Sequence, residues 1–129
     1  FDSEFAYEKD LQNFLVKNLD KIEEGLKLYD DGDINGVEFP AGNRRIDILA
    51  VDKENRLVVI ELKVSRGHDR TLGQIQYYIG WIKQNLAVNQ GVRGIIIAKD
   101  ITEDLRMASS VADVELREYS ISFSLMNVK

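Results

Sequence analysis

The sequence predicts an α/β fold in which a mixed β-sheet is flanked by helices. Apolar residues recur at helical spacing near the N-terminus and again between residues 71 and 89. Between these two stretches, strand-like runs at 45–51 and 57–63 are separated by a short polar turn, which is typical of a β-hairpin. The run at 94–98 is almost entirely apolar, as expected for a strand covered on both faces. A mixed sheet between helices accommodates all of these elements.

The N-terminal third is predicted to hold one helix and two short strands. An apolar stripe with helical period indicates a helix over 3–18. Short strands are expected at 26–29 and 37–39, the second ended by the only proline, Pro40. The intervening segment 30–36 is rich in Asp and Gly, which favours a turn.

The rest of the chain continues the alternation of strands and helices. A polar connection over 65–70 leads from the hairpin into the long helix of 71–89. A helix over 102–108 begins with a threonine that is a predicted N-cap. Final strands are expected at 114–117 and 120–125. The core order is therefore α-β-β-β-α-β, and we expect residues 1–129 to form a single domain.

Charge is unevenly distributed along the chain, whose net charge is −5. Residues 1–41 carry 4 basic and 11 acidic groups, net −7; residues 42–70 carry 7 and 5, net +2; residues 71–129 carry 6 and 6. The one basic segment thus surrounds the predicted hairpin. A strong non-specific attraction to nucleic acid is not expected of a net acidic chain.

Composition also excludes several classes of protein. The chain has no cysteine, which rules out disulfides and thiolate zinc sites and fits a reducing compartment, so we expect a cytoplasmic location. No apolar run approaches the roughly 18 residues of a membrane-spanning helix, so no membrane partner is expected.

Charged residues interrupt both strands of the hairpin. Asp47 lies between two isoleucines, and Glu61 and Lys63 are two residues apart, so they point to the same face of a strand. Burying an ionised carboxylate without a partner is very costly. Two carboxylates and a lysine that converge on one sheet edge therefore predict a divalent-metal site suited to phosphodiester cleavage.

Mg²⁺ and similar ions prefer hard oxygen ligands, usually one or two carboxylates with waters and phosphate oxygens. Asp47 and Glu61 would supply the carboxylates, and the backbone carbonyl of Leu62 a third oxygen. Lys63 would place a compact positive charge beside the attacking water or a phosphate oxygen. Two simpler readings stay open: Asp47 as a structural acid paired with an arginine, and Glu61 with Lys63 as an exposed ion pair.

These residues stand in a longer pattern. Asp47 followed by Glu61-Leu62-Lys63 resembles the Asp…Glu-x-Lys signature of the PD-(D/E)XK nuclease superfamily. With the acidic N-terminal helix at Glu8, the two strands look like the C-terminal nuclease domain of NucS-type endonucleases. The segment 74–78, Gln-Ile-Gln-Tyr-Tyr, is similar to the Gln-x-x-x-Tyr element of RecB-like nucleases. The resemblance covers most of the chain, from about residue 8 to residue 98.

The resemblance implies a restriction-endonuclease-like core and a DNA endonuclease that depends on Mg²⁺ or Mn²⁺. By this likeness Glu8, Asp47 and Glu61 form the metal cluster, Lys63 is catalytic and Gln74 helps to hold the site. NucS-type proteins carry a further N-terminal DNA-binding and dimerising domain, for which these 129 residues contain no counterpart. The preferred DNA (branched, mismatched or single-stranded) and the choice between monomer and homodimer therefore stay open.

Several residues are candidates for contacts with DNA. Arg44, Arg45, Arg66 and Arg70 could meet the phosphate backbone. Tyr78 follows Gln74 by one helical turn, so it lies on the same face and could pack against the site or a nucleotide. Two other functions are weighed beside the endonuclease: a non-cleaving DNA-binding module of nuclease ancestry, and a protein-interaction domain without a nucleic-acid role.

Overall fold

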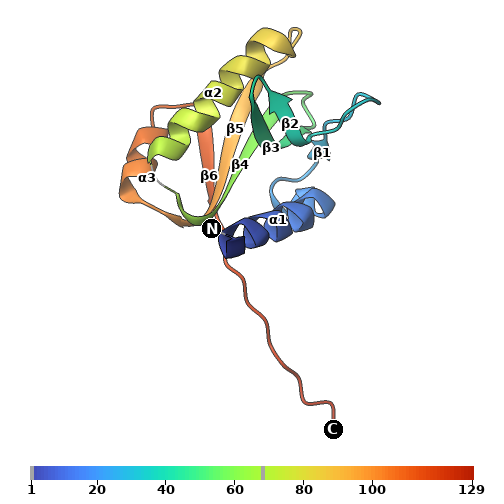
Figure 1. Cartoon of the computed structure of the whole chain (residues 1–129), viewed down its shortest axis with the longest axis vertical. Coiled ribbons are helices and arrows are strands. Elements are labelled where there is room, and N and C mark those ends of the chain that lie inside the picture. Colours follow the sequence, from blue (N-terminus) through green and yellow to red (C-terminus); the bar gives the residue numbers. More distant parts are fainter. Residues whose placement is uncertain (1, 68) are drawn as a thin grey trace.

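The computed structural model describes residues 2–67 and 69–129, and the side-chain surroundings of 7–64 and 70–129. Within these residues, six strands form one sheet with helices on both of its faces (Figure 1). The helices are α1 (Asp2–Lys17), the short 3₁₀ helix η1 (Leu19–Lys21), α2 (Asp69–Asn85) and α3 (Glu103–Ser109). The strands are β1 (Lys27–Leu28), β2 (Val37–Ala41), β3 (Arg44–Val51), β4 (Leu57–Gly67), β5 (Val92–Ile101) and β6 (Val114–Glu118). The predicted mixed sheet flanked by helices is confirmed.

The sheet joins an antiparallel half to a parallel half. Strand β3 pairs antiparallel with β1, β2 and β4, whereas β4, β5 and β6 run parallel to one another. A parallel pair needs a crossover connection, and α2 and α3 supply the two that this order requires. The predicted hairpin is the β3–β4 pair, in which Ile48 lies opposite Ile60.

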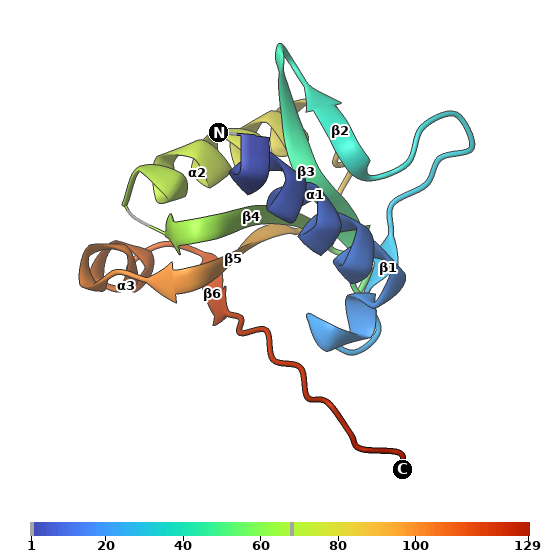
Figure 2. The same cartoon turned by 60° about the horizontal axis from the view of Figure 1, so that its bottom comes forward.

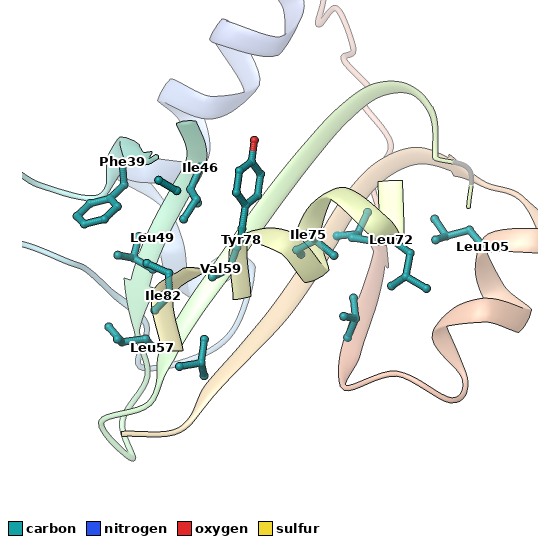
Figure 3. Packing of buried hydrophobic residues seen from close by; sticks show 14 residues of the cluster. Phe39, Ile46, Leu49, Leu57, Val59, Leu72, Ile75, Tyr78, Ile82 and Leu105 are labelled. Atoms are coloured by element: carbon teal, nitrogen blue, oxygen red, sulfur yellow. The ribbon is translucent and has the colours of Figure 1, made fainter. Parts of the chain in front are cut away.

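Two apolar clusters lie on opposite faces of the sheet. Leu49 and Val59 pack with Ile75, Tyr78 and other residues of α2 in the first cluster, which Figure 3 shows. On the other face, alternate residues of the same strands pack against α1 and η1. Because side chains alternate along a strand, each strand of the hairpin contributes to both clusters. This explains why the predicted strands read as nearly continuous apolar runs.

Helix α2 lies very close to the sheet where it crosses β5. A Cβ atom at Gly94 would come within 2.8 Å of Ile79 Cδ1 and 3.0 Å of Ile75 Cδ1. The missing side chain at this position therefore lets α2 approach the central strands. None of the helices in the described part of the chain combines the length and apolar content that a membrane crossing needs.

Several boundaries differ from the predictions: α2 spans Asp69–Asn85 instead of 71–89, and β5 spans Val92–Ile101 instead of 94–98. Strand β4 continues to Gly67, although residues 65–70 were predicted to be a connection, because Arg66 and Gly67 resume pairing with β5 after a register shift. Pro40 lies inside β2 rather than ending it, since β2 pairs only with β3 and an edge strand tolerates a missing N–H. Residues 120–125 form no strand, because they have no neighbouring strand among the described residues.

Candidate functional site

The β3–β4 hairpin brings the two predicted carboxylates together. The backbone N–H of Leu62 donates a hydrogen bond to Asp47 Oδ2 at 2.8 Å, which ties the side chain of β3 to β4 beside Glu61. Glu61 is only 3% exposed. Lys63 Nζ lies 3.6 Å from Glu61 Oε2, and the lysine side chain is partly exposed. The structure therefore places Asp47, Glu61 and Lys63 in one cluster.

This cluster holds more negative charge than its surroundings offset. Burial and, to a smaller extent, the negative charge of Asp47 raise the pKa of Glu61 to about 8, although the charge of Lys63 opposes the shift. Burial also raises the pKa of Asp47, although the Leu62 N–H and the Lys63 charge work in the other direction. Two carboxyl groups with raised pKa values are stabilised when they bind a proton or another cation.

Helix α2 adds two polar side chains to the same region. Gln74 Nε2 donates to Tyr78 Oη at 3.1 Å, which confirms that the two residues share a helix face. Tyr78 is only 2% exposed, and its hydroxyl points out of the apolar cluster in Figure 3. Burial and the charges of Glu61 and Asp47 raise the pKa of the Tyr78 hydroxyl. The ring of Tyr78 is thus buried in this structure, and its contact with DNA stays a prediction.

Helix α1, on the face of the sheet opposite α2, also contributes side chains to this region. The charge of Glu8 is close enough to raise the pKa of Glu61, so the helix brings this acid into electrostatic range of the pair. Gln12, which is 3% exposed, donates from Nε2 to the backbone carbonyl of Asp47 at 2.8 Å. Gln12 was not among the site residues predicted from the sequence. Its spacing of four residues after Glu8, inside an apolar stripe, was the available signal.

The donor set fits a hard divalent cation. Asp47 and Glu61 offer carboxylate oxygens, which Mg²⁺ and Mn²⁺ prefer, at a place where positive charge is deficient. Among the side chains that the structure describes, no three acidic or histidine residues converge at metal-binding distance. The roles of Glu8 and of the Leu62 carbonyl as further ligands therefore stay predictions.

The predicted DNA-contacting arginines lie around the hairpin and the start of α2. Arg44 stacks on the ring of Tyr77, with Cζ 4.1 Å from the ring centroid. Arg45 donates to the carbonyl of Glu38 at 3.4 Å and is otherwise exposed. Arg70 is exposed in the first turn of α2. The side chain of Arg66 lies outside what the structure describes, and contacts of all four with DNA stay predictions.

The tip of the β2–β3 hairpin rests on α2. Gly42 has φ +70°, and a Cβ atom there would lie 3.1 Å from Tyr77 Oη and 3.5 Å from Trp81 Nε1. A positive φ and this close approach both favour glycine. The contact holds the strand end that carries Arg44 against the helix that carries Gln74.

A second buried acid lies at the far end of β3. Asp52 accepts hydrogen bonds from the backbone N–H groups of Glu54 and Arg56, and its Oδ2 lies 2.9 Å from Arg56 Nε and 3.2 Å from Arg93 Nε. Arg93 also pairs with Glu23 and, at 2.7 Å, with Glu115. Burial works to raise the pKa of Asp52, but these donors outweigh it and the pKa is lowered. We call this group the Arg93 cluster.

Comparison with known proteins shows which family this chain resembles. The family model described as the endonuclease NucS C-terminal domain matches residues 7–127. Endonuclease NucS of Pyrococcus abyssi is 30% identical over 112 residues, which are 86% of this chain and 41% of the relative. The protein of the same name from Methanocaldococcus jannaschii is 29% identical over 120 residues, 93% of this chain and 40% of the relative. The chain thus spans less than half the length of these curated relatives.

Solved structures agree with these matches. The crystal structure of a repair endonuclease from Pyrococcus abyssi superimposes with a TM-score of 0.70 at 28% identity, covering 92% of this chain and 46% of that one. An EndoMS–dsDNA2 complex gives a TM-score of 0.72 at 22% identity, covering 95% and 46%, and supports the fold alone.

Proposed function

Because the chain belongs to the endonuclease NucS C-terminal domain family, we propose that it is a single PD-(D/E)XK-type nuclease domain that cleaves DNA with Mg²⁺ or Mn²⁺. The observation that carries the proposal is the pair of half-buried Asp47 and buried Glu61, whose charge Lys63 alone does not offset. The names of the relatives, endonuclease and repair endonuclease, support the same reaction class.

Asp47 and Glu61 would hold the divalent cation, with Glu8 and the Leu62 carbonyl as further candidates. A bound ion supplies charge neutralisation and a more acidic water near the scissile phosphate. The hydrogen bonds from Leu62 N–H and Gln12 fix β3 and the Asp47 carboxylate before any ion arrives. A site positioned in this way loses little free energy to reorganisation during the reaction.

Lys63 and α2 complete the proposed active site. The Lys63 ammonium lies next to Glu61 yet is partly exposed, so it can reach both the ion site and a phosphate oxygen. There it would stabilise the negative charge that develops on the phosphate. Gln74 would orient the Tyr78 hydroxyl at the edge of the acidic pair. Arg44, Arg45, Arg66 and Arg70 would bind the DNA backbone.

Cleavage assays with two substitutions test the proposal. Asp47→Asn keeps an acceptor for the Leu62 N–H but removes the charge, so it is expected to abolish Mn²⁺-dependent cleavage of single-stranded, flapped and mismatched DNA. Lys63→Ala is expected to lose rate but keep Mn²⁺ binding in calorimetry. Exposed Asp113→Asn and Lys99→Ala are the matched controls. Full activity of Asp47→Asn, or no Mn²⁺ binding by the wild type, contradicts the assignment.

A non-cleaving DNA-binding module is the second candidate, and the net charge of −5 favours it. Under this alternative, the wild-type chain with Mn²⁺ binds DNA more tightly as salt is lowered but leaves every substrate intact.

A further inference from the structure

Strand β2 adds a third acid to the pair of Asp47 and Glu61. The neighbours of Glu38 on β2 pair with the neighbours of Asp47 on β3, so these two acids face each other across the strands. The register of β3 and β4 in turn brings Asp47 beside Glu61. The charge of Glu38 is close enough to raise the pKa of Asp47. The three residues form a line across three strands, which we call the acidic row; because neighbouring strands lie about 4.8 Å apart, the row is about 10 Å long.

Two positively charged side chains converge on Glu38. Lys9 of α1 donates from Nζ to Glu38 Oε2 at 2.9 Å, and Arg45 of β3 donates from Nη1 to the Glu38 backbone carbonyl at 3.4 Å. The side chain of Lys9 is 44% exposed and that of Glu38 is 39% exposed, and Arg45 is exposed as well. An ammonium group has three N–H donors and a guanidinium group has five, so both cations keep donors that these two hydrogen bonds do not use.

Stability alone does not explain this arrangement. An ion pair as exposed as that of Lys9 with Glu38 contributes little to the free energy of unfolding. Glu38 also has φ +51°, in the left-handed region that is unfavourable for residues other than glycine. The fold therefore keeps Glu38 in an unfavourable conformation for an interaction that stabilises it only slightly. Residues in such conformations gather at functional sites, and Glu38 lies at the end of the acidic row.

Helix α1 holds Lys9 over one end of the acidic row. The helix lies across β3 and β4 (Figure 2) and packs on them through its apolar residues. Gln12, three residues after Lys9, donates to the Asp47 carbonyl and so fixes this part of the helix above the row. Lys63 lies 3.6 Å from the acid at the other end. The row therefore has one partly exposed lysine at each end.

We propose that Lys9 and Arg45 bind a DNA phosphate other than the scissile one, and that Glu38 positions Lys9 for this contact. The inference rests on the proposed function, under which the scissile phosphate lies at the Lys63 end of the row. Successive phosphates of one strand advance about 3.4 Å along the duplex axis, so the length of the row corresponds to about three nucleotides. A phosphate bound at the Lys9 end fixes the position of the DNA strand relative to the cleavage site.

The salt dependence of DNA binding tests the Lys9 contact. A labelled oligonucleotide is titrated, at about 50 to 200 mM salt, with the Asp47→Asn chain, which is expected to leave the DNA intact. Adding Lys9→Gln should lower the affinity about threefold to tenfold and reduce the slope of log K against log salt by about 0.7 to 0.9, as expected for the loss of one phosphate contact. Lys9→Arg should restore both quantities. Lys17→Gln removes the same charge two turns further along α1 and should leave the slope unchanged.

Two results would overturn the Lys9 contact. One is an unchanged slope in Lys9→Gln or an equal change in Lys17→Gln, and the other is the absence of any DNA binding at the lowest salt. Failure of the nuclease assignment is a separate outcome, because it appears as cleavage by Asp47→Asn or as a wild type that does not bind Mn²⁺, whatever the slope.

A double substitution tests the positioning role of Glu38. Glu38→Gly removes the side chain and accepts the positive φ, so this variant is expected to fold. Loss of a negative charge alone should tighten DNA binding, whereas loss of the residue that positions Lys9 should weaken it about threefold. In a chain that already carries Lys9→Gln, Glu38→Gly should no longer weaken binding. Tighter binding by Glu38→Gly alone, or the same loss with and without Lys9, means that Glu38 does not act through Lys9 and overturns this role.

Discussion

Two acids only five residues apart, Asp47 in β3 and Asp52 directly after it, experience opposite environments. Asp52 meets two guanidinium groups and two backbone N–H donors, and its pKa is lowered. Asp47 and its neighbour Glu61 share one lysine, and both of their pKa values are raised. The difference teaches that burial alone does not mark a functional acid. Glu61 is buried and Asp47 half-buried without the two guanidinium groups that compensate Asp52, which is why we propose these two as the functional acids.

The largest expected effect is on the cleavage rate, which should depend on Glu61 and not on Asp52. Glu61→Gln should lower the cleavage rate by about three orders of magnitude, because a site that loses its cation loses several kcal/mol of transition-state stabilisation. Its stability should not fall, since an amide relieves the repulsion from Asp47. Single-turnover cleavage and thermal unfolding of the same sample measure both quantities. Asp52→Asn should instead lower the thermal stability and leave the cleavage rate nearly unchanged. If both variants lose the same activity, the two acids do not differ in function.

The second effect is on stability. Arg93→Met leaves Asp52 buried with less compensation, and breaking a buried ion pair costs about 3–5 kcal/mol. Urea unfolding should show this loss, while the folded fraction still binds Mn²⁺. The control Arg106→Met removes an exposed ion pair with Glu103, which contributes between about 0 and 1 kcal/mol. An Arg93→Met variant as stable as that control would show that the Arg93 cluster is not structural.

The pH dependence of unfolding should differ in sign between the regions. Glu61 titrates near 8 in the folded state and near 4.5 otherwise, so the folded state binds more protons between these values and its stability falls as pH rises through them. Asp52 stabilises the fold above its ordinary pKa of 3.8, and that contribution is lost as pH falls. Thermal unfolding of chelator-treated protein from pH 3 to 9 measures both. Glu61→Gln should remove the fall in stability between pH 4.5 and 8. If the fall persists in this variant, it does not come from Glu61.

The smallest effect concerns how the acidic pair is held. Gln12→Met keeps the side-chain length but leaves the Asp47 carbonyl without its donor, at a cost of about 1–3 kcal/mol. We expect weaker Mn²⁺ binding as well, since β3 loses its tie to α1. Calorimetric titration checks this against Gln84→Met, an exposed residue of the same type on α2. Unchanged affinity would limit Gln12 to a structural role.

The sequence was sufficient for features that depend on local pattern. Nearly continuous apolar runs predicted β3, β4 and β5, and helical spacing predicted both long helices. The charges within the apolar strands predicted that Asp47 and Glu61 would come together. Pattern alone did not predict the extension of β4 to Gly67, because its pairing with β5 joins residues more than thirty positions apart. The segment 120–125 has strand periodicity, but a strand also needs a neighbour. Gln12 was missed for the same reason, since its partner lies on another element.

The contact between Gly42 and α2 gives the protein a built-in optical probe. Trp81, the only tryptophan, lies where the β2–β3 hairpin tip meets the helix, so its fluorescence reports on that one place. A ligand that lifts or tightens the hairpin, and with it Arg44 and Arg45, should change the emission without any attached dye. The moment at which the strand end moves can therefore be timed against the proposed phosphodiester cleavage.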